Sequence, residues 1–160
     1  MFGKYFFANF LIRDNNKLET IDDILDCMQN FLGSGTEFSS PNHKYAFLKI
    51  NNCSYQGKVY FWGYLSKILP ENIVEIAESG EIVSDTQENL IVSKSHFLID
   101  ISKKIIVYHP TKGIEDKLFL SAFQRIFEKY NEPINRSISI TKIDKTYEIL
   151  RGYLETGLEH

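Results

Sequence analysis

Short apolar runs, separated by turns of only a few residues, dominate the middle of this sequence. The runs 96–101 and 104–109 are only two residues apart, which predicts a hairpin. Two further strands are predicted at 45–50 and 58–66, joined by a longer loop over 51–57. Strands joined by connections this short must be antiparallel. The sequence therefore predicts a sheet that is mainly antiparallel.

Two segments have the three- and four-residue spacing of apolar side chains that is typical of an amphipathic helix. In 20–32, Thr20 is placed to cap the start of the helix, and Gly33 follows its end. The second helix, 114–130, is expected to pack an apolar stripe against the sheet. That stripe consists of Phe119, Ala122, Phe123, Ile126, Phe127 and Tyr130. A third helix is predicted to begin at Asp144.

Other segments complete the predicted architecture. Strands are expected at 4–13 and 136–142, whereas 73–77 and 81–84 fit either two strands or a short helix, and we favour strands. This order indicates an α+β domain with about five to seven strands and two or three helices packed on one face of the sheet.

Composition agrees with a globular domain. Of the 160 residues 43% are hydrophobic and 14% aromatic, with only 9 Gly and 4 Pro, which excludes collagen-like and disordered chains. The length predicts a single domain over 1–157, either a whole protein or a fragment of a longer one. Residues 158–160 resemble the remnant of a vector-derived tag.

The location is predicted to be cytoplasmic. The N-terminal apolar run, 5–12, is too short to span a membrane, so no membrane association is expected. Cys27 and Cys53 lack the spacing of metal ligands, and we interpret them as two free thiols in a reducing cytoplasm.

Charge is unevenly distributed along the chain, whose net charge is −3. Residues 38–69 contain no Asp or Glu but four lysines, namely Lys44, Lys49, Lys58 and Lys67. Residues 71–100 reverse this balance, with seven acidic residues against a single lysine, Lys94. One interpretation is that neighbouring solvated segments pair their charges; another is that the basic block forms a binding surface.

The basic block also contains the main candidate site. Period-two alternation predicts that seven of its residues share one face of the sheet: Tyr45, Phe47, Lys49, Lys58, Tyr60, Trp62 and Tyr64. Rings interleaved with lysines are typical of surfaces that bind single-stranded nucleic acid. The same residues would fit a face covered by a helix, a solvated sheet paved with tyrosine, or a surface for a partner protein. We predict a protein partner or self-association, with single-stranded nucleic acid as the alternative.

A second candidate is a histidine pair. If the hairpin turns at Ser102-Lys103, His96 stands opposite His109, with Asp100 on the same face. Two imidazoles could ligate zinc or supply a general base, but two ligands are an incomplete zinc site. We interpret them as ordinary histidines.

Catalytic and cofactor signatures are missing from the sequence. It contains no phosphate-binding loop, dinucleotide-binding fingerprint, zinc-protease motif, nucleophile elbow or EF-hand loop. Cys53 has no His or Lys beside it that could activate a nucleophile. We therefore predict a non-enzymatic interaction or regulatory domain without a metal, a cofactor or an identifiable small-molecule ligand.

Overall fold

The computed structural model describes residues 4–69 and 91–143. Within them, eight strands form one antiparallel sheet. Seven follow the order β2-β1-β7-β6-β5-β4-β3, and β8 pairs with β1 along the edge opposite β7. The strands are β1 (Phe6–Asp14), β2 (Lys17–Leu18), β3 (Glu37–Ser39), β4 (Lys44–Tyr55), β5 (Lys58–Ile68), β6 (Ile91–Asp100), β7 (Ile105–Tyr108) and β8 (Arg136–Ile143). The helices are α1 (Ile21–Leu32) and α4 (Asp116–Tyr130).

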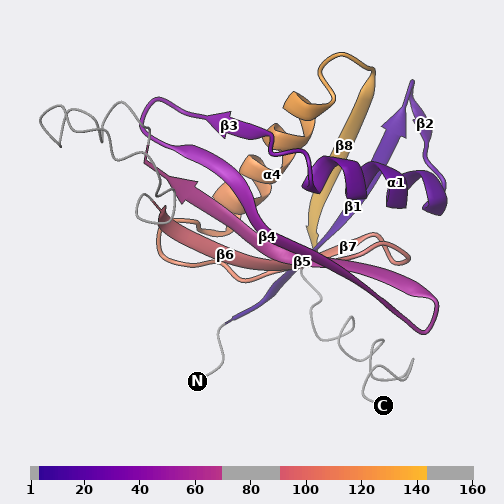
Figure 1. The fold of residues 1–160 in the computed structure, drawn as a ribbon, viewed down its shortest axis with the longest axis horizontal. Helices are drawn as coiled ribbons and strands as arrows, with labels where there is room; N and C mark the ends of the chain where they lie inside the picture. Colours follow the sequence, from indigo (N-terminus) through magenta and orange to yellow (C-terminus); the bar gives the residue numbers. More distant parts are fainter. Residues whose placement is uncertain (1–3, 70–90, 144–160) are drawn as a thin grey trace, which may run out of the picture.

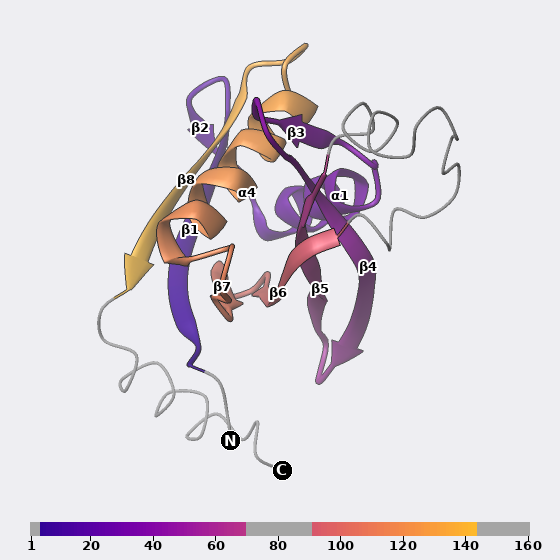
Figure 2. The same cartoon turned by 90° about the vertical axis from the view of Figure 1, so that its left-hand side faces the viewer.

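The sheet curls into a half-barrel around both helices, which lie on its concave side (Figures 1 and 2). We call this concave side the inner face and the opposite side the outer face. The α+β class and the antiparallel sheet are thus confirmed. The sheet has more strands than the predicted five to seven, because β2 and β3 are too short for a sequence pattern to reveal. The strands predicted at 73–77 and 81–84, and the helix from Asp144, lie outside the described residues.

Local signals place both helices where they were predicted. The Thr20 hydroxyl oxygen accepts a hydrogen bond from the Asp23 N–H at 3.2 Å, and Gly33 ends α1. Helix α4 begins at Asp116 rather than at 114. Its predicted apolar stripe is buried from Phe119 to Phe127, whereas Tyr130 is half-buried.

Aromatic rings fill much of the core between helices and sheet. Phe31 of α1 lies 5.0 Å from Phe127 and 5.3 Å from Phe47, measured between ring centroids. Phe123 of α4 contacts Phe31, Phe47 and Phe97 with centroid distances of 5.3–6.1 Å. Most of these pairs meet edge to face, which is a favourable geometry for aromatic rings.

Two polar clusters hold the helices to β8. The buried Glu19 carboxylate accepts a hydrogen bond from Arg136 Nε at 2.8 Å, and other guanidinium nitrogens lie 3.5 Å from the Asn131 side-chain oxygen and 3.7 Å from Asp14. At the other end of β8, Asp116 accepts hydrogen bonds from Tyr108 and Lys142.

These contacts shift the pKa values of the second cluster. Burial alone would raise the pKa of Asp116, but the hydrogen bonds from Lys142 and Tyr108 outweigh it and hold that pKa below its usual value. Burial, together with the bond to Asp116, raises the pKa of the Tyr108 hydroxyl.

The hairpin between β4 and β5 differs from the prediction. No loop spans 51–57, because β4 continues to Tyr55 and the turn is Gln56-Gly57 alone. Both turn residues have left-handed backbones, with φ of 52° and 74°, as a type I′ hairpin requires.

A β-bulge interrupts the pairing of these two strands. Leu48 pairs with Tyr64 and Asn51 pairs with Trp62, so β4 has one extra residue at this point. Lys49 takes up the bulge with a left-handed backbone, φ 53°. The strand opposite has Gly63, where a Cβ would lie only 2.6 Å from Ile50 Cδ1. The same Cβ would lie 3.0 Å from the Leu48 carbonyl oxygen and 3.1 Å from that of Lys49, which are backbone atoms, so the bulge favours glycine across from it.

Candidate binding groove on the outer face of the sheet

Three of the seven predicted site residues lie together on the outer face. Trp62 and Tyr64 are there by strand alternation, and Lys49 joins them through the bulge. The bulge also turns Ile50 toward the core. Trp62 remains 38% exposed, which is unusual for an indole in the middle of a sheet.

Tyr45 and Phe47 do not share this face, and the prediction that they do is wrong. Tyr45 is 5% exposed and Phe47 packs its ring in the core, both on the inner face. The physical reason is the bulge, since one extra residue exchanges the two faces of a strand. Phe47 is therefore opposite Leu65, which is a core residue.

Tyr60 and Lys58 lie outside the groove. Tyr60 has the same alternation as Trp62 but is only 8% exposed, where it pairs with Asp100 of β6. Burial raises the pKa of the Tyr60 hydroxyl, and the nearby Asp100 carboxylate adds to the effect. Burial likewise raises the pKa of Tyr45. Lys58 is exposed beside the hairpin turn.

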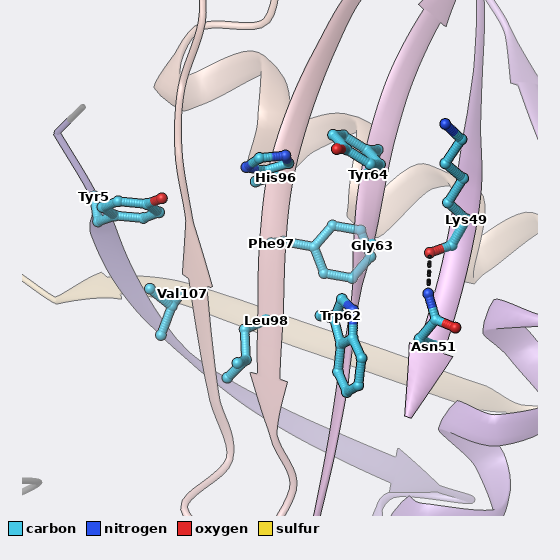
Figure 3. A pocket seen from close by; sticks show the side chains of 10 residues that line it. All are labelled: Tyr5, Lys49, Asn51, Trp62, Gly63, Tyr64, His96, Phe97, Leu98 and Val107. Atoms are coloured by element: carbon cyan, nitrogen blue, oxygen red, sulfur yellow. Dashed lines mark hydrogen bonds between the residues drawn. The ribbon is translucent and has the colours of Figure 1, made fainter. Parts of the chain in front are cut away.

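The site is a groove of about 540 Å³ that crosses β4, β5, β6 and β7 (Figure 3). Its described lining residues are Tyr5, Lys49, Asn51, Trp62, Gly63, Tyr64, His96, Phe97, Leu98 and Val107. Ring contacts hold two of its tyrosines: Tyr64 lies 4.4 Å from His96 between centroids, and Tyr5 lies 5.0 Å from the neighbouring His109. The indole of Trp62 and the aliphatic Leu98 and Val107 supply apolar surface.

Two lysine side chains, Lys94 and Lys49, lie at or next to the groove. Lys94 Nζ lies 4.9 Å from the centroid of the Tyr64 ring, in cation–π geometry. Lys49 extends along the opposite side of the groove from Tyr5 (Figure 3). Its backbone carbonyl accepts a hydrogen bond from the Asn51 side chain at 3.0 Å, which ties the bulge to the next residue that lines the groove.

The predicted histidine pair is present, but the two rings contact different residues. The His109 N–H donates to the His96 carbonyl at 2.9 Å, so the two residues are direct neighbours as predicted. The His109 ring packs on Tyr5 and its Nδ1 lies 2.9 Å from the Lys4 carbonyl, whereas His96 packs on Tyr64. Residues 4–69 and 91–143 contain no group of three or more His, Cys, Asp or Glu side chains that could hold a metal ion.

The two cysteines are free and lie apart from the groove. Cys53 is exposed near the hairpin turn, and Cys27 is buried on α1. Burial raises the pKa of the Cys27 thiol to about 11.

The basic block does not form one surface. Lys44 pairs with Glu37 at 3.6 Å, and Lys67 donates a hydrogen bond to the Gly113 carbonyl at 3.2 Å. Of the four predicted lysines, only Lys49 lines the groove. Lys94 of β6, which the sequence did not indicate, lies next to the groove over the Tyr64 ring.

Several groove residues were not predicted. Leu98 could have been found, because it alternates with His96 on a strand that was correctly identified. Tyr5 and Val107 could not, because they reach the groove only through pairing between β1 and β7, which are about a hundred residues apart in the chain.

No protein-family model matches the chain, and a search of curated protein sequences finds no match. Within the described residues, no helix combines the length and apolar character that crossing a membrane requires.

Proposed function

We propose that the domain is a non-enzymatic interaction module that binds a segment of a partner protein in the groove on its outer face. The supporting observation is Trp62, which is exposed in a groove whose other lining residues are mostly aromatic rings and aliphatic side chains, together with the polar Lys49 and Asn51. Exposed apolar surface in a concave site is typical of binding sites, and Trp and Tyr are enriched among residues that dominate interface energies.

The lysine positions favour a protein segment over single-stranded nucleic acid. A nucleic-acid surface needs cations that follow the phosphate backbone, and two lysines of the basic block are already engaged by Glu37 and by the Gly113 carbonyl. The chain also has a net charge of −3. That charge would repel a long polyanion along the sheet.

Fluorescence provides a direct test, because Trp62 is the only tryptophan of the chain. A library of short tryptophan-free peptides is titrated into the protein, with oligo(dT) in a parallel series. We expect some peptides to change the Trp62 emission saturably and oligo(dT) to leave it unchanged. In the Trp62→Ala variant, binding of the same peptides, followed by a dye on the peptide, should fall at least tenfold. Ile134→Ala, which truncates another exposed apolar residue, should bind normally.

Other outcomes would contradict the proposal. Quenching by oligo(dT) that weakens as salt rises would assign the groove to nucleic acid. A concentration-dependent rise in sedimenting mass that Trp62→Ala abolishes would show that a second copy of the chain fills the groove.

A further inference from the structure

We infer that the segment bound in the groove is acidic, with carboxylates flanking one large apolar side chain. The inference rests on the proposed function and names the chemistry of the partner. Charge and apolar surface are arranged separately within the groove, and each part restricts what the segment can contain.

The charge on the groove is of one sign. Lys49 lines one side, and Lys94, which is not itself a lining residue, lies over the ring of the lining residue Tyr64. None of the described residues lining the groove is acidic. The acidic residue of the same face, Asp100, is buried and accepts hydrogen bonds from the Ser102 hydroxyl and the Lys103 N–H. A carboxylate that enters the groove therefore meets cations without a competing anion on the described lining.

The apolar surface lies between Lys49 and Tyr5. Figure 3 shows Leu98 and Val107 on neighbouring strands, with the Trp62 indole beside Leu98. These side chains offer van der Waals contact to a large aliphatic or aromatic residue but no hydrogen-bonding partner for a polar one, apart from the indole N–H. A partly exposed site of this kind favours an apolar residue by the area that binding removes from water.

The net charge of the chain favours a short acidic segment over a long polyanion. The net charge of −3 opposes anions at long range, so the attraction must come from the two lysines at close range. A segment with a few carboxylates can place all of its charge close to these lysines. A polynucleotide, with one charge at each nucleotide, extends beyond the lysines and meets the repulsion of the rest of the chain.

Two synthetic peptides test the inference. In the first, Phe and Leu alternate with Glu, and in the second they alternate with Lys. We expect the acidic peptide to change the Trp62 emission with an affinity at least tenfold above that of the basic peptide. Lys49→Glu should weaken the acidic peptide roughly fivefold or more and strengthen the basic one, because the reversed charge acts on both ligands with opposite sign. Lys17→Glu, a charge reversal at an exposed lysine of β2, should change neither affinity.

The results separate the two proposals. Equal affinities for the two peptides, or an unchanged affinity in Lys49→Glu, would overturn the acidic segment while leaving the groove as a binding site. If neither these peptides nor the library changes the emission, the groove does not bind protein segments and both proposals fail. If oligo(dT) binds more tightly than the acidic peptide, the groove is a binding site for single-stranded nucleic acid instead. Circular dichroism of each variant checks that it remains folded.

Discussion

Replacing Arg136 with methionine should destabilise the fold by about 3–5 kcal/mol, because the change leaves the Glu19 carboxylate buried without its cation. The Glu19 side chain is only 4% exposed, and one of its oxygens depends on Arg136 Nε at 2.8 Å. Its other oxygen, Oε2, is buried and has no hydrogen-bond partner in the described part of the chain. The second ion pair of Arg136, with the more exposed Asp14, adds less than about 1 kcal/mol.

A double-mutant cycle identifies the source of this loss. Glu19→Gln keeps the size of the side chain and removes the charge, so it should cost about 1–2 kcal/mol. Once Glu19 is neutral, Arg136→Met no longer leaves a charge unpaired. The double variant should therefore be more stable than the sum of the single changes predicts, by about 1–3 kcal/mol.

Urea unfolding, followed by far-ultraviolet circular dichroism and by Trp62 emission, measures these differences. The midpoint should shift while the dependence on urea concentration stays constant. Lys17→Met, at an exposed position, should stay within about 0.5 kcal/mol of the wild type. A loss below about 1 kcal/mol for Arg136→Met, or strictly additive losses in the cycle, would refute the view that Arg136 compensates the charge of Glu19.

Three further predictions concern the core, the bulge and the start of α4. Phe123→Ala should lower the free energy of unfolding in urea by about 3–5 kcal/mol, because it leaves a cavity in the core. Ser121→Ala, on the exposed side of α4, should leave it unchanged. A loss below about 1 kcal/mol for Phe123→Ala would mean that Phe123 is not buried. Gly63→Ala should cost about 1–3 kcal/mol, because its Cβ would lie 2.6 Å from Ile50 Cδ1 and 3.0 Å from the Leu48 carbonyl oxygen of the backbone, and an unchanged melting temperature would contradict the bulge geometry. The lowered pKa of Asp116 means that its ionised form stabilises the fold above the usual carboxyl pKa of 3.8, and that this contribution is lost as the pH falls through its folded-state pKa. Asp116→Asn should therefore melt below the wild type at neutral pH, with a difference that shrinks at acidic pH; a constant difference would exclude this linkage.

The helices could be predicted because their signals are local. The Thr20 cap and the stripe around Phe123 depend on residues within a few positions of one another, and the structure confirms both. The strands extend further than predicted where the sequence is polar. Residues 51–55 belong to β4 although most are polar and all are exposed, and no sequence rule predicts the left-handed backbone of Gln56.

In the candidate site, a single bulge in β4 moves Tyr45 and Phe47 away from the face on which strand alternation placed them. The turn at Gln56-Gly57 pairs Tyr55 with Lys58, and regular pairing from there would bring Tyr45 to the face of Trp62, as the alternation predicts. The extra residue at Lys49 reverses that assignment for the first half of β4. Gly63 makes the bulge sterically feasible, but its importance emerges only when β4 and β5 are paired. Lys49, Trp62 and Tyr64 are therefore the part of the prediction that the structure brings together.

The position of β1 has a consequence for how the chain folds as it is synthesised. Of the described strands, β1 is synthesised first, yet it lies inside the sheet between β7 and β8. Its partners for Phe6 and Asp14 are Tyr108 and Arg136, which are made only after about a hundred further residues. Until then most of the backbone of β1 is unpaired and open to wrong strands. The closing of the sheet is thus a late event, which depends on contacts between the two ends of the described chain.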